Sequence, residues 1–233
     1  VHRSEHMGWY EGASLLHHLE DLYISSDRNL IDSRFPVQYV LRPQSDDFHD
    51  YRGYAGTVSG GVFRVGDEVL VLPSGFTSKI RSIDTMDGSI EEAFSPMAVS
   101  ITLEDDIDVS RGDMICRENN RPHVSQDIDA MVCWMTSDSS LRVQDKLAIK
   151  HTTNVARALV KDLHYRLDIN TLHRDEDSVS LDLNEVGRVS LRTTAPIFFD
   201  EYRRNRRTGS FILIDETTNN TVGAGMILGP TQV

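Results

Sequence analysis

Residues 97–103 read MAVSITL, and this short stretch decides the class of fold. Apolar residues occupy every second position and small or hydroxyl residues lie between them, which is typical of a half-buried β-strand. The same alternation recurs at 188–192 and 222–228, and residues 211–214 (FILI) form a continuous apolar run of strand length. Turn signals separate these runs at Ser59-Gly60-Gly61, Pro73-Ser74-Gly75, Asp87-Gly88 and Asn219-Asn220. We therefore predict an all-β protein built of sandwiches or barrels.

The composition is that of an ordinary globular protein. The chain of 233 residues carries 24 Lys and Arg against 36 Asp and Glu, a formal net charge of −12. No apolar run approaches the roughly 18–20 residues that span a bilayer, which excludes a membrane protein. The 2 cysteines are too few for a disulfide scaffold. The acidic balance argues against a general polyanion binder, although an electropositive surface could still lie within the nearly balanced residues 124–233.

The N-terminal region predicts a helix and a linker. Val1 is not a start methionine and no signal peptide follows it, so we expect a fragment whose N-terminal part is missing. Residues 8–24 (GWYEGASLLHHLEDLYI) place leucines at helical spacing and predict a short helix that needs a surface to pack on. Residues 25–27 should end it, residues 28–34 should form a linker, and Pro36 excludes a helical continuation.

Residues 155–169 are compatible with two structures. Leu159, Leu163 and Leu167 lie four residues apart, as on one face of a helix. Leu163, Tyr165, Leu167 and Ile169 also alternate with polar residues, as in a strand. Periodicity alone leaves both open. We favour a strand, because β-rich neighbours need a partner for their edges.

A short turn-like element occurs three times, at 64–69 (RVGDEV), 110–115 (SRGDMI) and 142–147 (RVQDKL). Each copy lies just before an apolar strand pattern. Glycine tolerates positive φ in such turns, and aspartate can accept hydrogen bonds from nearby backbone N–H groups. A repeated ligand-binding loop is the functional alternative, but hairpin chemistry is the simpler explanation.

No motif places catalysis on this chain. The phosphate-binding pattern G-x-x-x-x-G-K-[ST] is absent. Gly223-Ala224-Gly225 resembles part of a dinucleotide fingerprint, but no helical pattern follows it. The carboxylates clustered at 104–108 and 175–177 are more simply solvated loops than an acid–base pair. We expect no catalytic residue here.

Metal binding is equally unsupported. Cys116 and Cys133 have no C-x-x-C partner and lie in apolar strand patterns, where free cysteine is usually a small buried hydrophobe. The adjacent His17 and His18 point to different faces of a helix, so they cannot clamp one ion together. We expect no metal site.

The sharpest local feature is the run YRRNRRTG at 202–209. Its arginines are Arg203, Arg204, Arg206 and Arg207. The functional interpretation is a patch that docks a phosphate or an acidic partner surface. The structural interpretation is a solvated loop, partly neutralised by Asp200 and Glu201, that leads into the strand at 211. The sequence leaves both open.

Several segments together resemble a known family. Trp9-Tyr10-x-Gly12 followed by Leu15-Leu16-x-x-Leu19-Glu20 resembles the last helix of a translation-type GTPase domain. Residues 54–72 (YAGTVSGGVFRVGDEVLVL) are similar to the second domain of elongation factor Tu relatives. Residues 185–227, with 150–153 (KHTT) and 165–172 (YRLDINTL), resemble the large, GTP-hydrolysing subunit of sulfate adenylyltransferase. The actinobacterial form, often fused to adenylylsulfate kinase, is the most similar.

The resemblance implies an architecture of two tandem closed β-barrels preceded by one short helix. Residues 1–26 would be the C-terminal helix of a missing GTPase domain and 27–35 a linker. The first barrel would span 36–122 and the second 123–233. The resemblance also favours the strand for 155–169.

The resemblance implies that the intact protein helps to convert ATP and sulfate into adenylylsulfate and pyrophosphate, driven by GTP hydrolysis. GTP and Mg²⁺ would bind in the missing domain, and this fragment alone would carry no cofactor and no GTPase activity. Its expected partners are the small catalytic subunit, docked at the arginine run, and its own GTPase domain. Neither a membrane nor a nucleic acid is expected, and the implied location is cytoplasmic.

Two other functions remain open at this point. Related barrels of elongation factors hold aminoacyl-tRNA, so an RNA-binding module is one alternative. Its footprint should be basic and strongly salt-dependent, which the acidic balance of residues 33–123 disfavours. The other alternative is a β-rich scaffold without a partner, which co-elution with the small subunit would exclude.

Overall fold

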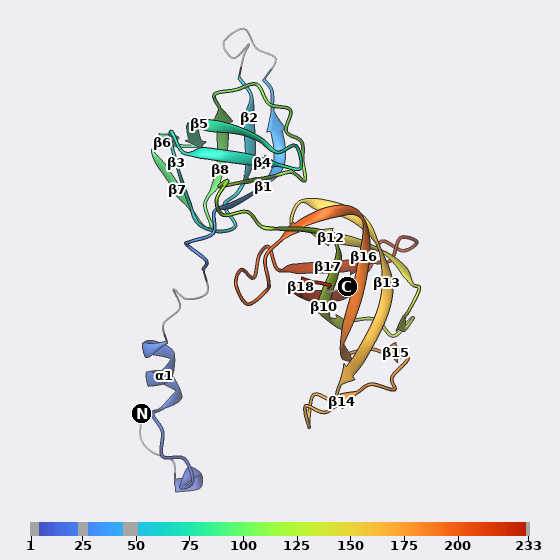
Figure 1. Ribbon diagram of the computed structural model, residues 1–233. Coiled ribbons are helices and arrows are strands. Elements are labelled where there is room, and N and C mark those ends of the chain that lie inside the picture. Colours follow the sequence, from blue (N-terminus) through green and yellow to red (C-terminus); the bar gives the residue numbers. More distant parts are fainter. Residues whose placement is uncertain (1–4, 23–27, 44–50, 232–233) are drawn as a thin grey trace.

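The computed structural model describes residues 5–22, 28–43 and 51–231. Two β-barrels follow one another along the chain, and a short helical segment precedes them (Figure 1). The fold is mostly β, as the alternation in the sequence predicts.

The first barrel is closed, because the strands at the two ends of its ring order pair with each other. The ring runs β4-β9-β1-β2-β8-β5, and β5 pairs with β4 to complete it. All of these neighbours are antiparallel. The strands of this part are β1 Arg34–Leu41, β2 Gly53–Thr57, β3 Val62–Arg64, β4 Glu68–Leu72, β5 Phe76–Thr85, β6 Gly88–Ile90, β7 Glu92–Phe94, β8 Ala98–Leu103 and β9 Met114–Cys116.

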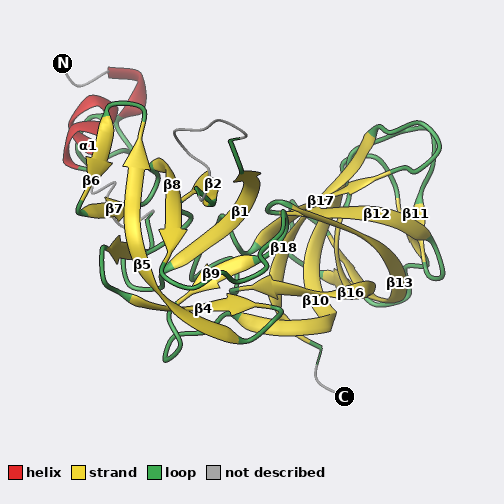
Figure 2. Ribbon diagram, turned by 90° about the horizontal axis from the view of Figure 1, so that it is seen from above, coloured by secondary structure: helices red, strands yellow, loops and turns green. Residues whose placement is uncertain are grey.

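The second barrel closes in the same way. Its ring runs β12-β17-β18-β10-β16-β13, and β13 pairs with β12. Figure 2 shows the long, curved strands of this barrel beside the first. The strands are β10 His123–Trp134, β11 Leu141–Arg142, β12 Lys146–His151, β13 Asn154–Leu167, β14 Arg174–Asp175, β15 Ser180–Leu181, β16 Val186–Phe199, β17 Ser210–Ile214 and β18 Thr221–Pro230.

Each barrel encloses its own apolar core. Phe35, Phe63 and Tyr54 are fully buried in the first, and Trp134 and Phe199 in the second. Burial at alternate positions of β5 and β18 matches the period of two read from the sequence. Because the rings are closed, their ring strands leave no unpaired edge.

The strand patterns of the sequence are confirmed. MAVSITL gives β8, and the three C-terminal patterns give β16, β17 and β18. The ambiguous residues 155–169 fall largely in β13, which pairs with β12 on one side and β16 on the other. Two pairing partners supply the strand hydrogen bonds that favour this structure over the helix.

The N-terminal helix is shorter than predicted. Helix α1 spans only Leu15–Asp21, and the backbone N–H of His17 donates to Ser14 Oγ at 3.1 Å, so Ser14 caps it. Gly8 and Gly12 are poor helix formers, which explains why the helix does not extend back to residue 8. The expected end at 25–27 lies outside the described residues.

The predicted linker is partly strand, since β1 begins at Arg34. Helix α1 stands apart from both barrels (Figure 1), and its leucines are exposed; Leu15 is 72% exposed.

The three repeated elements are β-turns that lead into β4, β9 and β12. They are not hairpin turns, because none of these strands pairs with the strand that comes before its turn. Asp67, Asp113 and Asp145 each accept a hydrogen bond from the backbone N–H three residues earlier, at 3.0, 2.8 and 2.7 Å. The residue before each aspartate has a positive φ, including the non-glycine Gln144 at 76°. These contacts support the structural explanation of the repeat.

Candidate functional site at the junction of the barrels

A buried ion pair joins the two barrels. The Nε and Nη2 of Arg34 donate to the two carboxylate oxygens of Asp200, both at 2.9 Å. Arg34 lies at the start of β1 and Asp200 directly follows β16, and their side chains are 1% and 4% exposed. This bidentate geometry is the strong form of an arginine–carboxylate contact.

The remaining polar atoms of this pair are also bonded. Arg34 Nη1 donates to the carbonyls of Ser33 at 2.9 Å and Asn120 at 2.7 Å. The hydroxyl of Thr208 donates to Asp200 Oδ2 at 2.7 Å. A buried charge needs such partners to offset its lost hydration, so the junction is fully hydrogen-bonded at its centre.

A buried histidine extends the network into the second barrel. His151, at the end of β12, is 2% exposed, and its Nε2 donates to the carbonyl of Thr208 at 2.7 Å. Burial lowers the pKa of this imidazole below its usual value, although the bond to Thr208 and the nearby Asp200 act in the opposite direction. His151 is therefore held neutral near neutral pH.

A second ion pair crosses the junction beside the first. The Nε and Nη2 of Arg204 donate to Asp32 at 2.6 and 2.7 Å, and Asn29 Nδ2 donates to the same carboxylate at 2.5 Å. Asp32 is 1% exposed. Burial alone would raise the pKa of Asp32, but these hydrogen bonds outweigh it and hold that pKa well below its usual range.

Close backbone approach completes the junction. Asn205 Nδ2 donates to the carbonyl of Ser59 at 3.1 Å. A Cβ added at Gly60 would lie 2.6 Å from the carbonyl oxygen of Asp32 and 2.8 Å from Asn205 Nδ2. Only glycine therefore fits at position 60, because any side chain would meet backbone there.

Apolar contacts also cross the junction. Leu70 and Leu72 of β4 and Met114 and Cys116 of β9 form a buried cluster with Phe198 of β16. Burial raises the pKa of the Cys116 thiol to about 11, as expected for a small buried hydrophobe. The junction thus combines an apolar cluster with a satisfied polar network, which is typical of a stable interface.

The arginine run is divided between two roles. The loop at 202–209 connects β16 to β17. Arg204 is bound to Asp32, although 59% of its side chain is exposed. Arg203 is 86% exposed and lies 3.6 Å from Glu201, and Arg206 is exposed as well. Arg207 turns toward a cleft between the barrels. The loop is therefore both part of the junction and a cationic surface beside it.

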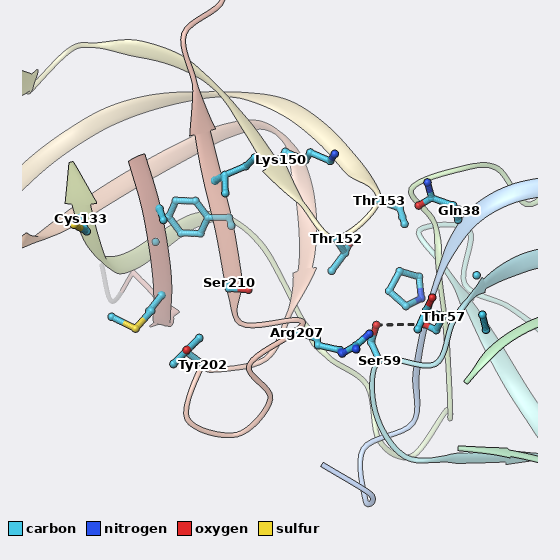
Figure 3. A pocket seen from close by; sticks show the side chains of 18 of the residues that line it. Gln38, Thr57, Ser59, Cys133, Lys150, Thr152, Thr153, Tyr202, Arg207 and Ser210 are labelled. Carbon is cyan, nitrogen blue, oxygen red and sulfur yellow. Dashed lines mark hydrogen bonds between the residues drawn. The ribbon is translucent and has the colours of Figure 1, made fainter. Parts of the chain in front are cut away.

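The cleft has a volume of about 990 Å³. The first barrel contributes β1, β2 and β8 to its wall, and the second contributes β12, β17 and β18. Figure 3 shows Lys150, Thr152 and Arg207 on one side and Gln38, Thr57 and Ser59 on the other. Its size is that of a ligand pocket, and its wall mixes small apolar residues with hydroxyl groups.

The acidic clusters are structural where they are described. Arg52 pairs with Asp106 and, at 2.8 Å, with Asp108. Arg166 pairs with Asp175 at 2.8 Å. Within residues 5–22, 28–43 and 51–231, no group of three or more His, Cys, Asp or Glu side chains is placed to hold a metal ion. Over the same residues, no helix is both long and apolar enough to cross a bilayer.

The central residues of the junction were not identified from the sequence. The sequence places Arg34 in a linker, Asp200 beside the arginine run and His151 in a segment that carries the family resemblance. Arg34 and Asp200 are 166 residues apart, so no local pattern could pair them. The one sequence signal at Arg34 and at Asp200 is that each is a charged residue next to a buried strand.

Comparison with known proteins defines the class. Residues 127–228 match the family described as GTP-eEF1A C-terminal domain-like. The structure resembles sup35 complexed with GDP, with a TM-score of 0.78 and 19% identity. This match covers 96% of this chain and 53% of the sup35 chain. Elongation factor SelB from Methanococcus maripaludis, in its apo form, matches with a TM-score of 0.69 and 18% identity. That match covers 94% of this chain and 47% of the SelB chain. The fold is that of the paired barrels of translation factors.

Sequence similarity identifies the particular family. The bifunctional enzyme CysN/CysC of Mycobacterium tuberculosis (strain ATCC 25618 / H37Rv) is 58% identical over 98% of this chain and 37% of its own length. Sulfate adenylyltransferase subunit 1 of Bacteroides fragilis (strain YCH46) is 48% identical over 98% of this chain and 47% of its own length. The chain belongs to the sulfate adenylyltransferase subunit 1 family, and it spans less than half the length of these curated relatives.

Proposed function

We propose that this chain is the β-barrel part of the GTPase subunit of a sulfate adenylyltransferase. The reaction would convert ATP and sulfate into adenylylsulfate and pyrophosphate, driven by GTP hydrolysis. The observation that carries this proposal is the 58% identity to CysN/CysC over 98% of the chain. GTP and Mg²⁺ would bind to another part of the intact protein, and the protein would work in the cytoplasm.

The barrels would act as one body in this enzyme. Arg34–Asp200, Arg204–Asp32 and the apolar cluster around Phe198 tie them together. Coupling between a nucleotide site and a partner requires elements that change contacts together. Because the two barrels are fixed to each other, a displacement of the GTPase domain would move both barrels together and so move the partner bound to the second barrel.

The loop at 202–209 would dock the small catalytic subunit. Arg203, Arg206 and Arg207 are exposed, and the exposed half of Arg204 lies beside them. The contact of Arg204 with Asp32 fixes the loop in place, so less conformational entropy would be lost when the partner binds. An acidic surface on the small subunit would be the complementary partner.

Charge reversal of the loop tests this docking role. We expect Arg203→Glu with Arg206→Glu and Arg207→Glu to weaken small-subunit binding at least tenfold at low salt and less at high salt. Arg204 is left unchanged because it holds the junction. The matched control reverses Arg111, Arg142 and Lys161, which are exposed elsewhere. If both triple variants bind the small subunit with equal affinity, the loop is not the docking surface.

A further inference from the structure

The wall of the cleft between the barrels carries cationic side chains and no acidic ones among the described residues. The formal net charge of the chain is −12. Yet no Asp or Glu occurs among the described residues that line the cleft, whereas Lys150 and Arg207 both do. Neither of these two side chains forms an ion pair with another described residue. On an acidic protein, two unpaired cations on an acid-free wall favour an anionic occupant.

The rest of the wall would accept apolar groups. Ile212 and Met226 line it from the second barrel and Ala55 and Ala98 from the first. Met226 is 39% exposed although it lies on a sheet. Hydroxyls stand between these apolar residues, and Thr153 Oγ1 is buried with no hydrogen-bond partner in the described part of the chain. A rotamer change would turn this hydroxyl toward an occupant.

The positions of the two cations indicate an extended occupant. Figure 3 shows Lys150 and Arg207 at separate points along the cleft, with Thr152 between them. An extended chain with spaced carboxylates could pair with one cation at each of these points. The ring strands in the wall are already paired on both sides. Recognition would therefore use side chains and not the addition of a strand.

We propose that the cleft binds an extended segment of the small catalytic subunit that carries acidic and apolar side chains. Charge complementarity supports this occupant, as does continuity, because Arg207 belongs both to the cleft and to the loop at 202–209. The inference rests on the proposed docking of the small subunit, and it adds a second contact area across both barrels. Such a segment would contact the two barrels at once and reinforce their junction.

Two cleft variants test the proposal in the intact large subunit. Lys150→Glu should lower the affinity for the small subunit roughly five- to tenfold at low salt. Ala98→Trp should lower it too, by filling the apolar part of the cleft from the first barrel. The control is Lys146→Glu, because Lys146 is exposed on the same strand but does not line the cleft. Unchanged thermal melting would show that the variants fold.

The outcomes separate the two proposals. If the cleft variants bind normally while Arg203→Glu with Arg206→Glu weakens binding, the cleft inference is overturned and loop docking stands. If neither set of variants changes the affinity, both proposals are overturned. A benzophenone attached at Gln38→Cys, in a Cys133→Ser background, should cross-link to the small subunit. Cross-links found only within the large subunit would show that its own GTPase domain fills the cleft, against the proposal.

Discussion

Arg34 and Asp200 form a bidentate, almost fully buried ion pair that connects the first strand of one barrel to the end of β16 in the other. Removing one partner from such a pair leaves an uncompensated buried charge. We expect Asp200→Ala to lower the free energy of unfolding by about 3–5 kcal/mol. Urea denaturation measures this directly.

The matched control for this prediction is Asp127→Ala. Asp127 lies 3.4 Å from Arg192 in a pair whose side chains are 37% and 54% exposed, so its loss should cost no more than about 1 kcal/mol. Replacing both members, as in Arg34→Met with Asp200→Leu, should recover much of the lost stability. Equal losses for Asp200→Ala and Asp127→Ala would contradict the assigned role.

His151 should make the protein less stable in mild acid. Its pKa is lowered in the fold, so the unfolded chain takes up a proton near pH 6.5 that the folded protein does not. Stability is therefore full above about pH 6.5 and falls by at most about 1.4 kcal/mol per pH unit below it, until the folded pKa is reached. His151→Gln, which keeps a donor for Thr208, should flatten this slope. A slope that is the same in His151→Gln and in the parent would rule out His151 as the cause.

Asp32 should affect the stability of the protein at a lower pH than His151 does. Its pKa is lowered in the fold, so its contribution is present above the usual carboxyl pKa near 3.8 and is lost as the pH falls below that value. We expect Asp32→Asn to be less stable than the parent at pH 6, with the difference shrinking toward pH 2. Urea midpoints measured across this range test the prediction, and a difference that stays constant with pH would refute it.

Gly60 should tolerate no side chain. A Cβ there would overlap the carbonyl of Asp32, so Gly60→Ala should destabilise the protein by about 1–3 kcal/mol. Gly8→Ala is the control, because nothing lies within 4 Å of a Cβ at that position. Thermal melting of both variants provides the comparison, and a neutral Gly60→Ala would mean that the junction adapts more easily than its geometry implies.

Much of the fold could be predicted because it follows from patterns among residues close in the sequence. The alternation in 97–103 and the turn elements around Asp67, Asp113 and Asp145 depend on residues close in sequence. The extent of the N-terminal helix was wrong, because a stripe of leucines does not show where glycine and a serine cap stop the helix. Ring closure was implied only by resemblance, since it depends on pairing between strands far apart in the sequence, such as β1 with β9 and β10 with β18.

The candidate site could be predicted only in part. The arginine run is a local excess of charge and was visible at once. Its division into Arg204, which binds Asp32, and Arg207, which faces the cleft, depends on contacts with a segment more than 140 residues away. Arg34 carried no distinguishing pattern, because a single charge beside a strand is usually solvated. Pairing between distant charges follows from the way the barrels meet.

Docking by the barrels is tested most directly by the affinity of this chain alone for the small subunit of sulfate adenylyltransferase, measured by calorimetry at two salt concentrations. We expect a complex whose dissociation constant rises with salt and rises again when Arg203, Arg206 and Arg207 are changed to Glu. Absence of binding by this chain, under conditions in which the intact large subunit binds, would contradict the claim that the barrels carry the docking surface.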